Sequence, residues 1–247
     1  MRRSFKALKL FFLLGGLLFY LSFIVKFSYA VPMGGDVTFL SSDAYTASPK
    51  SRTDDGATIN TIIVSVQQQN DAWKAYVGNV TGKYVLRNSN NFSIYEWPLS
   101  ANITGEVYLS RNNSVNFSAG AVVCANNSAL VAEQVVFGMA EADTDNINNT
   151  FNTSDHSSFR VGSTLFNQDD CAAIALWVNN TPQTPGSTAL FQQIALYDGH
   201  TVFYASLINK GKTGFDNTTT YDFQAIVAEN RSAAAGTAYY FYVELGS

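Results

Sequence analysis

Residues 190–208, LFQQIALYDGHTVFYASLI, contain two apolar, β-prone runs on either side of Asp198-Gly199. An Asp-Gly pair between two such runs is typical of a tight type I′ β-hairpin, because both central residues of that turn need a positive φ. The stretch therefore predicts two neighbouring antiparallel strands.

The segments around this hairpin repeat the same pattern of short β-prone runs bounded by Gly, Asn, Asp and Pro. Residues 172–178 (AAIALWV) precede it, and residues 221–228 (YDFQAIVA) and 238–245 (AYYFYVEL) follow it. Residues 82–97 (GKYVLRNSNNFSIYEW) have the form of a second hairpin, with its turn in the asparagine-rich centre. Almost nothing after residue 30 has helical period. We therefore expect an all-β fold, an antiparallel β-sandwich of Ig-like or jelly-roll-like type with long polar loops.

The remaining β-prone runs include DVTFLS (36–41), TINTIIVSV (58–66) and EQVVFGMA (133–140), which we expect to be strands. A turn-rich polar stretch follows the first of them and indicates a flexible linker. The expected organisation is a leader at 1–30, an N-terminal strand with its linker at 31–56, and a β-sandwich domain at 57–247.

The first thirty residues have the order of a secretory signal peptide. Four basic residues precede an uncharged run from Leu10 to Val25, and Ser28 and Ala30 are the small residues that a signal peptidase reads. We expect cleavage after Ala30 and a secreted or cell-surface protein. The alternative is a retained membrane anchor, although a helix of this run would be about 24 Å long, shorter than a hydrocarbon core of about 30 Å.

Removal of the leader leaves an acidic protein. Five of the fifteen basic residues and none of the nineteen acidic residues lie in it, so the remainder has a net charge of −9. Nucleic acid and anionic membranes bind basic surfaces, which argues against either as a partner. We expect self-association or binding to other surface proteins, and membrane attachment only through a retained leader.

The two cysteines, Cys124 and Cys171, both lie in the exported part of the chain. An even pair in an oxidising compartment predicts a disulfide. Two buried free thiols and a zinc pair are the alternatives, although no His or Cys lies at ligand spacing from either.

Sequons for N-glycosylation are dense in this sequence. Eleven of the twenty-two asparagines begin an Asn-x-Ser/Thr motif, where the Ser and Thr content gives about four by chance. Enrichment of these residues in turns explains part of the excess. Nine of the motifs are expected at turns or strand ends, and together with Asn126 they give the predicted glycan sites: Asn79, Asn91, Asn102, Asn112, Asn126, Asn148, Asn152, Asn179, Asn217 and Asn230. The eleventh, Asn116, is expected to be unmodified if its side chain faces inward.

The loop DTDNINNTFNTSDH, residues 143–156, is the best candidate for a metal site. Asp143 and Asp145 are weak metal candidates because they resemble the start of a calcium loop. Ile147 stands where a third ligand belongs, and the turn glycine and closing Glu are missing. We expect no cofactor, with calcium as the alternative, and a glycan-bearing loop that faces outward.

Catalytic motifs are missing from the sequence. It has no nucleophile elbow, zincin helix, phosphate-binding Gly-rich loop or Cys-x-x-Cys pair, and His156 has no identifiable catalytic partner. We therefore expect no catalytic residues and no enzyme. A cell-wall hydrolase with paired carboxylates is one alternative. The other is an adhesin or carbohydrate-binding module that uses Trp73, Trp97 and Trp177 as a platform, although tryptophans in strands are more often core residues.

Several motifs resemble those of a family of uncharacterised, exported, β-rich surface proteins predicted in small-genome archaea. They are a Trp-x-x-Tyr-x-Gly-Asn segment (73–79), a Cys-Ala-Asn (124–126), a second Cys after the Asn-rich loop, and YFYVEL (240–245). The resemblance implies a surface location, pairing of the two cysteines and a β-rich domain. Members with a C-terminal anchor differ from this chain, which stops at Gly246-Ser247, so a C-terminal tether is not expected.

These features together predict a secreted, N-glycosylated structural surface protein. The hypothesis is a subunit of an extracellular filament or coat, assembled by donation of the N-terminal strand at residues 31–42 to the sheet of a neighbouring copy.

Overall fold

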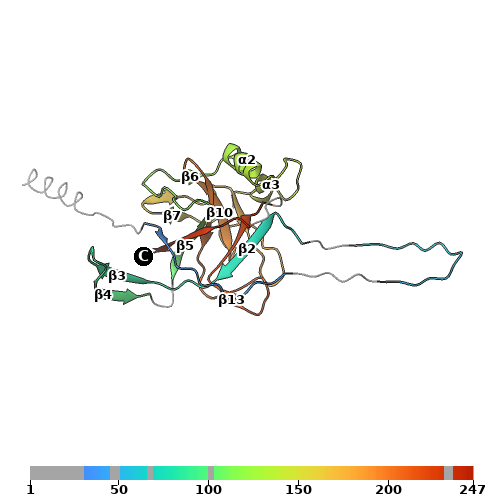
Figure 1. The fold of residues 1–247 in the computed structure, drawn as a ribbon, viewed down its shortest axis with the longest axis horizontal. Helices are drawn as coiled ribbons and strands as arrows, with labels where there is room; N and C mark the ends of the chain where they lie inside the picture. The colour runs from blue at the N-terminus through green and yellow to red at the C-terminus, as the bar shows by residue number, and fades with distance from the viewer. Residues whose placement is uncertain (1–30, 45–50, 66–68, 100–102, 231–235, 247) are drawn as a thin grey trace, which may run out of the picture. The chain divides into compact units, whose positions relative to one another are not determined.

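The structure is a computed structural model that describes residues 31–44, 51–65, 69–99, 103–230 and 236–246. The expected signal peptide lies outside these described residues. The strands pair in antiparallel sheets and the helices are short (Figure 1). The predicted all-β, sandwich-like fold is confirmed.

The largest sheet is built around the hairpin of residues 190–208 and has seven strands. Its path runs through β1 (Met33–Gly34), β15 (Tyr240–Gly246), β5 (Thr104–Ser110), β11 (Val202–Leu207), β10 (Gln192–Tyr197) and β6 (Val123–Cys124), and β9 (Ala173–Ala175) also pairs with β10. This main sheet joins strands from both ends of the described chain.

The turn between β10 and β11 differs from the predicted type. Tyr197 pairs with Val202, and Asp198 N donates to Thr201 O at 3.4 Å, so Gly199 and His200 are the central residues. Only Gly199 of these two has a positive φ (89°), which is the sign pattern of a type II′ turn rather than type I′. The Asp198 carboxylate accepts hydrogen bonds from the N–H groups of His200 and Thr201, which holds the turn one residue further along than predicted.

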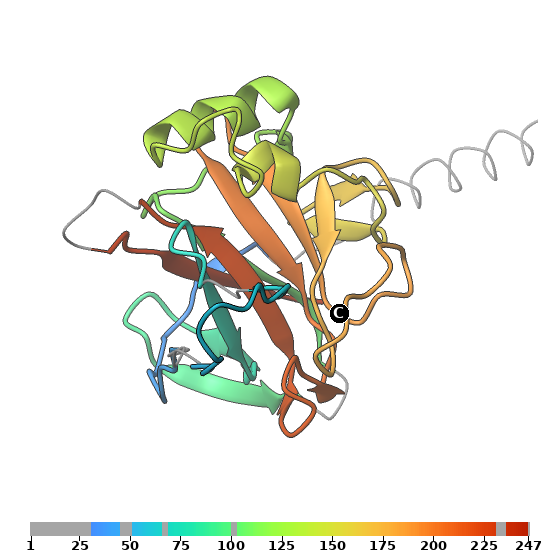
Figure 2. The ribbon, with the colours of Figure 1, turned by 90° about the vertical axis from the view of Figure 1, so that its right-hand side faces the viewer.

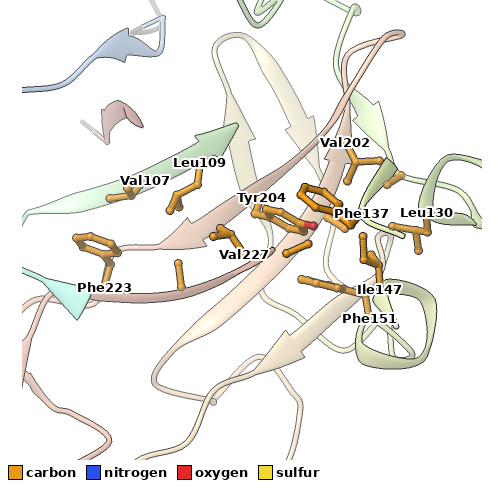
Figure 3. Packing of buried hydrophobic residues seen from close by; sticks show 14 of the residues in the cluster. Val107, Leu109, Leu130, Phe137, Ile147, Phe151, Val202, Tyr204, Phe223 and Val227 are labelled. Carbon is orange, nitrogen blue, oxygen red and sulfur yellow. The ribbon is translucent and has the colours of Figure 1, made fainter. Parts of the chain in front are cut away.

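Both faces of the main sheet are covered. On one face, β14 (Phe223–Ala228) and β2 (Trp73–Gly78) form a second, two-stranded layer, and Phe223 and Val227 pack among Val107, Leu109 and Tyr204 (Figure 3). On the other face, the hairpin of β7 (Phe159–Val161) and β8 (Thr164–Phe166) covers a second buried cluster. Strands buried on both faces need apolar residues at successive positions, which explains the near-continuous apolar runs of β10 and β11.

Two short helices lie at one end of the main sheet (Figure 2). Helix α2 (Asn127–Val136) begins after Asn126, whose side chain accepts a hydrogen bond from Ala129 N, and α3 (Ile147–Thr150) begins after Asn146 in the same way. The strand predicted at 133–140 is therefore wrong, since most of it belongs to α2 and the turn after it. The local β-propensity of its valines is outweighed by this N-cap and by burial of Leu130 and Phe137 in the core.

The N-terminal part of the chain also differs from the prediction. The strand expected at 36–41 is instead the two-residue β1, and residues 36–44 and 51–65 contain no strand. Thr58–Ser65, expected to open the sandwich domain at residue 57, are exposed, and the first strand of the second layer is β2. We call residues 36–44 and 51–65 the arm.

Two further hairpins complete the described fold. One is formed by β12 (Lys212–Thr213) and β13 (Thr220–Tyr221), and the other by β3 (Lys83–Arg87) and β4 (Ser93–Pro98). The β3–β4 hairpin is the one predicted at 82–97, and its turn contains Asn91 with a φ of 67°.

Candidate functional site

The Asn-rich loop uses its aspartates for structural hydrogen bonds. Asp143 Oδ2 accepts from Ala140 N, and Asp145 Oδ2 accepts from Asn70 Nδ2, each at 2.8 Å. The carbonyl of Asp145 accepts from Trp73 Nε1 at 2.7 Å. Within the described ranges no three His, Cys, Asp or Glu side chains gather where they could hold a metal ion. The structure therefore does not bring the weak metal candidates Asp143 and Asp145 together with further ligands of these types.

His156 is buried at the end of this loop, so the whole loop does not face outward as expected. Its Nε2 accepts from Cys171 N at 2.9 Å, and its Nδ1 donates to Ser157 O at 2.7 Å. Each ring nitrogen thus has a backbone partner, and its ring packs edge-on against Phe159. This arrangement gives His156 a structural role in joining the loop to the strand region after Cys171.

The two cysteines lie at disulfide distance. The sulfur atoms of Cys124 and Cys171 are 1.93 Å apart, and the described residues contain no free cysteine. Cys124 lies on β6 and Cys171 just before β9, and both strands pair with β10. The bond links these two neighbours of β10 and encloses α2, α3 and the Asn-rich loop between its ends.

None of the sequon asparagines in the described part of the chain is buried. They are exposed at Asn79, Asn91, Asn116, Asn126, Asn152, Asn179 and Asn217 and half-buried at Asn112, Asn148 and Asn230, whereas Asn102 lies outside the described residues. Asn116, expected to be unmodified if it faced inward, is exposed. Nothing in these positions conflicts with glycans at the predicted sites, which remain predictions.

The three tryptophans lie on different elements. Trp73 is half-buried against Phe151, with ring centroids 6.3 Å apart, whereas Trp97 and Trp177 are exposed. The nearest aromatic partner of Trp97 is Tyr95, at 4.7 Å between ring centroids. Trp73 therefore packs at the edge of the hydrophobic core, whereas Trp97 is part of an exposed aromatic surface.

That surface is one face of the β3–β4 hairpin. Tyr84 pairs with Trp97 and Leu86 with Tyr95 across the two strands, so all four side chains share a face. All are exposed, Trp97 at 48 %. Tyr84 Oη donates to the carbonyls of Leu245 and Gly246, which anchors the hairpin at the end of β15. We call these four side chains the aromatic face.

The opposite face of the hairpin carries a charged pair, and exposed Ile94 (80 %) lies at the register shift near its turn. Lys83 forms an ion pair with Glu96 at 2.5 Å, and Arg87 donates to Asn91 and Ser93. The hairpin was predicted from the sequence, but this division into two faces was not. The alternation Tyr84-x-Leu86 and Tyr95-x-Trp97 is visible in the sequence and is the signal that identifies it.

The arm carries a second exposed apolar surface. Val37, Phe39 and Leu40 are exposed in its first part, and Ile59, Ile62, Ile63 and Val64 in its second. Exposed apolar groups of this extent commonly mark interaction sites. The aromatic face and the arm are therefore the two candidate functional surfaces.

One carboxyl pair is deeply buried. Glu106 on β5 and Glu244 on β15 are directly opposite in the main sheet. Glu244 accepts hydrogen bonds from Gly162 N and from Tyr108 Oη. Because both carboxyls are shielded from solvent, the pair has the character of a structural network, not of a hydrolase site open to a polymer.

Comparisons with known protein families, with curated proteins and with solved structures find no match for this chain. In the part of the chain that the structure describes, no helix has the length and apolar character needed to cross a membrane.

Proposed function

We propose that this chain is a secreted, N-glycosylated structural protein of the cell surface whose copies join by strand pairing, as a subunit of an extracellular filament or coat. The observation that carries the proposal is that residues 58–65 have a β-prone, apolar sequence but form no strand and lie exposed. Six of these eight residues are β-branched, yet they form no strand and Ile63 is 97 % exposed. A segment whose local preference is extended and apolar, left in solvent, suits pairing with another chain.

Residues 31–42, the donor strand expected from the sequence, are partly paired within their own chain. Met33 and Gly34, inside the 31–42 stretch first expected to leave the domain, pair with Val243 and Tyr242 of their own chain. The second part of the arm has no such pairing among the described strands, so we now assign donation to residues 58–65.

Surface chemistry supports an extracellular location. None of the ten described sequon asparagines is buried, the cysteines lie at bonding distance, and the net charge after leader removal is negative. Glycans on turns and strand ends, together with a disulfide, are features of exported proteins.

The test is to export the full chain from a host with N-glycosylation and to examine the secreted material by electron microscopy and intact-mass analysis. We expect ordered assemblies, loss of residues 1–30 and added glycan mass. A monomer at every concentration tested, with the unmodified mass, would contradict the proposal.

A second candidate function, a carbohydrate-binding adhesin, is favoured by the aromatic face alone. Exposed Tyr95 and Trp97 offer ring faces on which sugars can stack. A glycan array probed with the secreted protein and with its Trp97→Ala variant separates the two functions, because an adhesin loses glycan binding in the variant and a structural subunit shows none in either.

A further inference from the structure

The β3–β4 hairpin is a two-stranded sheet that could pair with a further strand. β3 and β4 pair only with each other among the described strands, so each has an outer edge with unpaired backbone groups. Its aromatic face remains in solvent. An isolated two-stranded hairpin is only marginally stable in water, and a sheet with an apolar face usually needs a third strand to be stable.

The arm supplies a strand with the matching properties. Residues 58–65 contain no charged residue and no proline, and their period of two would place Ile59, Thr61 and Ile63 on one face and Ile62 and Val64 on the other. When the backbone pairs with the outer edge of β3, one of these two rows lies beside Tyr84 and Leu86 on the same side of the sheet and packs against them.

Charge complementarity selects the edge and the direction. Arg87 ends β3 and donates hydrogen bonds to the neutral side chains of Asn91 and Ser93, whereas Lys83 at the other end is ion-paired with Glu96. Asp55 lies just before the donor segment, next to Asp54, which is paired with Arg52. If the donor runs antiparallel to β3, Asp55 lies near Arg87 and the uncharged end of the donor lies near Lys83.

We propose that residues 58–65 of one copy add as a third strand, antiparallel to β3 of a second copy, so that one row of their side chains lies beside Tyr84 and Leu86 and extends the aromatic face. The inference rests on the proposed function, because it names the acceptor of the donated strand. Donor and acceptor are different surfaces of the same chain, so the contact is heterologous and repeats into an open chain of subunits rather than a closed dimer.

The experiment uses a donor variant and an acceptor variant of the secreted full chain. Ile62→Lys/Ile63→Lys places a charge in both rows of the donor, and Leu86→Lys/Tyr95→Lys does so on the aromatic face. Val135→Lys is the matched control, because Val135 is an exposed apolar residue of α2 (73 %) outside both surfaces. All five positions are exposed, so far-ultraviolet circular dichroism and thermal unfolding should match the unsubstituted protein.

We expect each double variant alone to be monomeric by light scattering, with association weakened at least about tenfold, while Val135→Lys assembles normally. An equimolar mixture of the two double variants should form dimers and no longer species, because each mixed pair has one working donor and one working acceptor. This mixing result is the signature of a heterologous contact.

The direction of the added strand has its own test. Asp55→Arg and Arg87→Asp should each weaken association about two- to fivefold, as expected for an exposed ion pair, and the two together should restore it. Failure of the combined variant to recover would overturn the antiparallel addition to β3.

The outcomes distinguish the inference from the proposed function. Filaments that persist in the acceptor variant would overturn the hairpin as acceptor and leave the structural role intact. A cross-link between residues 58–65 and β3 within a monomer would overturn addition to a second copy. Absence of any assembly by the unsubstituted protein would overturn both proposals.

Discussion

Glu106 of β5 lies directly opposite Glu244 of β15, and both carboxyl groups are buried. Burial, followed by the charge of Glu244, raises the pKa of Glu106 to about 8. Burial also raises the pKa of Glu244, although hydrogen bonds from Gly162 N and Tyr108 Oη favour its charged form. The pair therefore holds a proton on Glu106 at neutral pH, since two adjacent buried carboxylates would repel each other.

Loss of this proton from Glu106 makes the fold less stable as pH rises. A carboxyl whose pKa is higher in the folded state contributes fully below its ordinary pKa of 4.5, and that contribution is lost as pH rises toward 8. We expect the melting temperature to fall between pH 5 and pH 8, and Glu106→Gln, which cannot ionise, to flatten the fall and to be more stable than the unsubstituted protein at pH 8. Thermal unfolding by circular dichroism across this range is the measurement, with exposed Glu141→Gln as the control. An equal slope in Glu106→Gln would refute the assignment.

Glu229 has the opposite effect on stability. Partial burial opposes its ionisation, but hydrogen bonds from Lys74 and Thr237 outweigh this and lower the pKa of Glu229 to about 2. Its contribution is present above pH 4.5 and is lost as pH falls toward 2. Glu229→Gln should therefore reduce the free energy of unfolding by about 2 kcal/mol at pH 7, and the difference should vanish near pH 2. Denaturant unfolding at both pH values tests this, and Glu96→Gln, from the exposed pair with Lys83, should change little at either.

The sequence predicts best those elements that depend on interactions between residues close together in the chain. The hairpin at 190–208 and the β3–β4 hairpin follow from short-range alternation and turn residues, and the disulfide from the even pair of cysteines after the expected leader. Burial of Glu106 could not be predicted, because it lies on the face of β5 that points away from Val107, and that face is covered by segments distant in the sequence, among them the β7–β8 hairpin and Phe117. The strand predicted in the second part of the arm was wrong for a related reason. Residues 58–65 have the composition of a strand, but they have no partner among the described strands.

The same distinction applies to the candidate site. The sequence identified Trp97, but its aromatic neighbours on the hairpin depend on the strand register, which pairs Leu86 with Tyr95. His156 was assigned to a solvated loop because its burial depends on contacts with Cys171 and Phe159, which follow from the tertiary fold.

The disulfide should contribute strongly to stability. Cys124 and Cys171 are 47 residues apart, and closing a loop of this length stabilises a fold by about 4 kcal/mol in the chain-entropy model. We expect Cys124→Ser/Cys171→Ser to lose about this much free energy of unfolding in denaturant. Alkylation of the unsubstituted protein without reductant should leave its mass unchanged. Addition of two alkyl groups under those conditions would show free thiols.

His156 should be required for folding stability. Replacement by Ala removes the acceptor of Cys171 N–H and the donor to Ser157 O, and it leaves a cavity beside Phe159. One buried and one partly buried backbone group without a partner, together with the lost packing, should lower the free energy of unfolding by about 2–4 kcal/mol. His200→Ala is the control, because His200 is exposed in the turn between β10 and β11. Equal stability of the two variants would show that the buried hydrogen bonds of His156 contribute nothing.

Asn126 combines two roles that substitution can separate. Its side chain caps α2 by accepting a hydrogen bond from Ala129 N at 2.9 Å, and it begins a predicted sequon. Ser is also a good N-cap residue but cannot carry an N-linked glycan, whereas Ala can do neither. If the site is glycosylated, Asn126→Ser and Asn126→Ala should both lose one glycan by intact mass, and only Asn126→Ala should lose the cap, at about 1 kcal/mol in the unfolding of protein produced without glycans. An equal loss of stability in both variants would show that the cap contributes nothing that Ser can replace. An unchanged mass in both would remove Asn126 from the set of glycosylated sites.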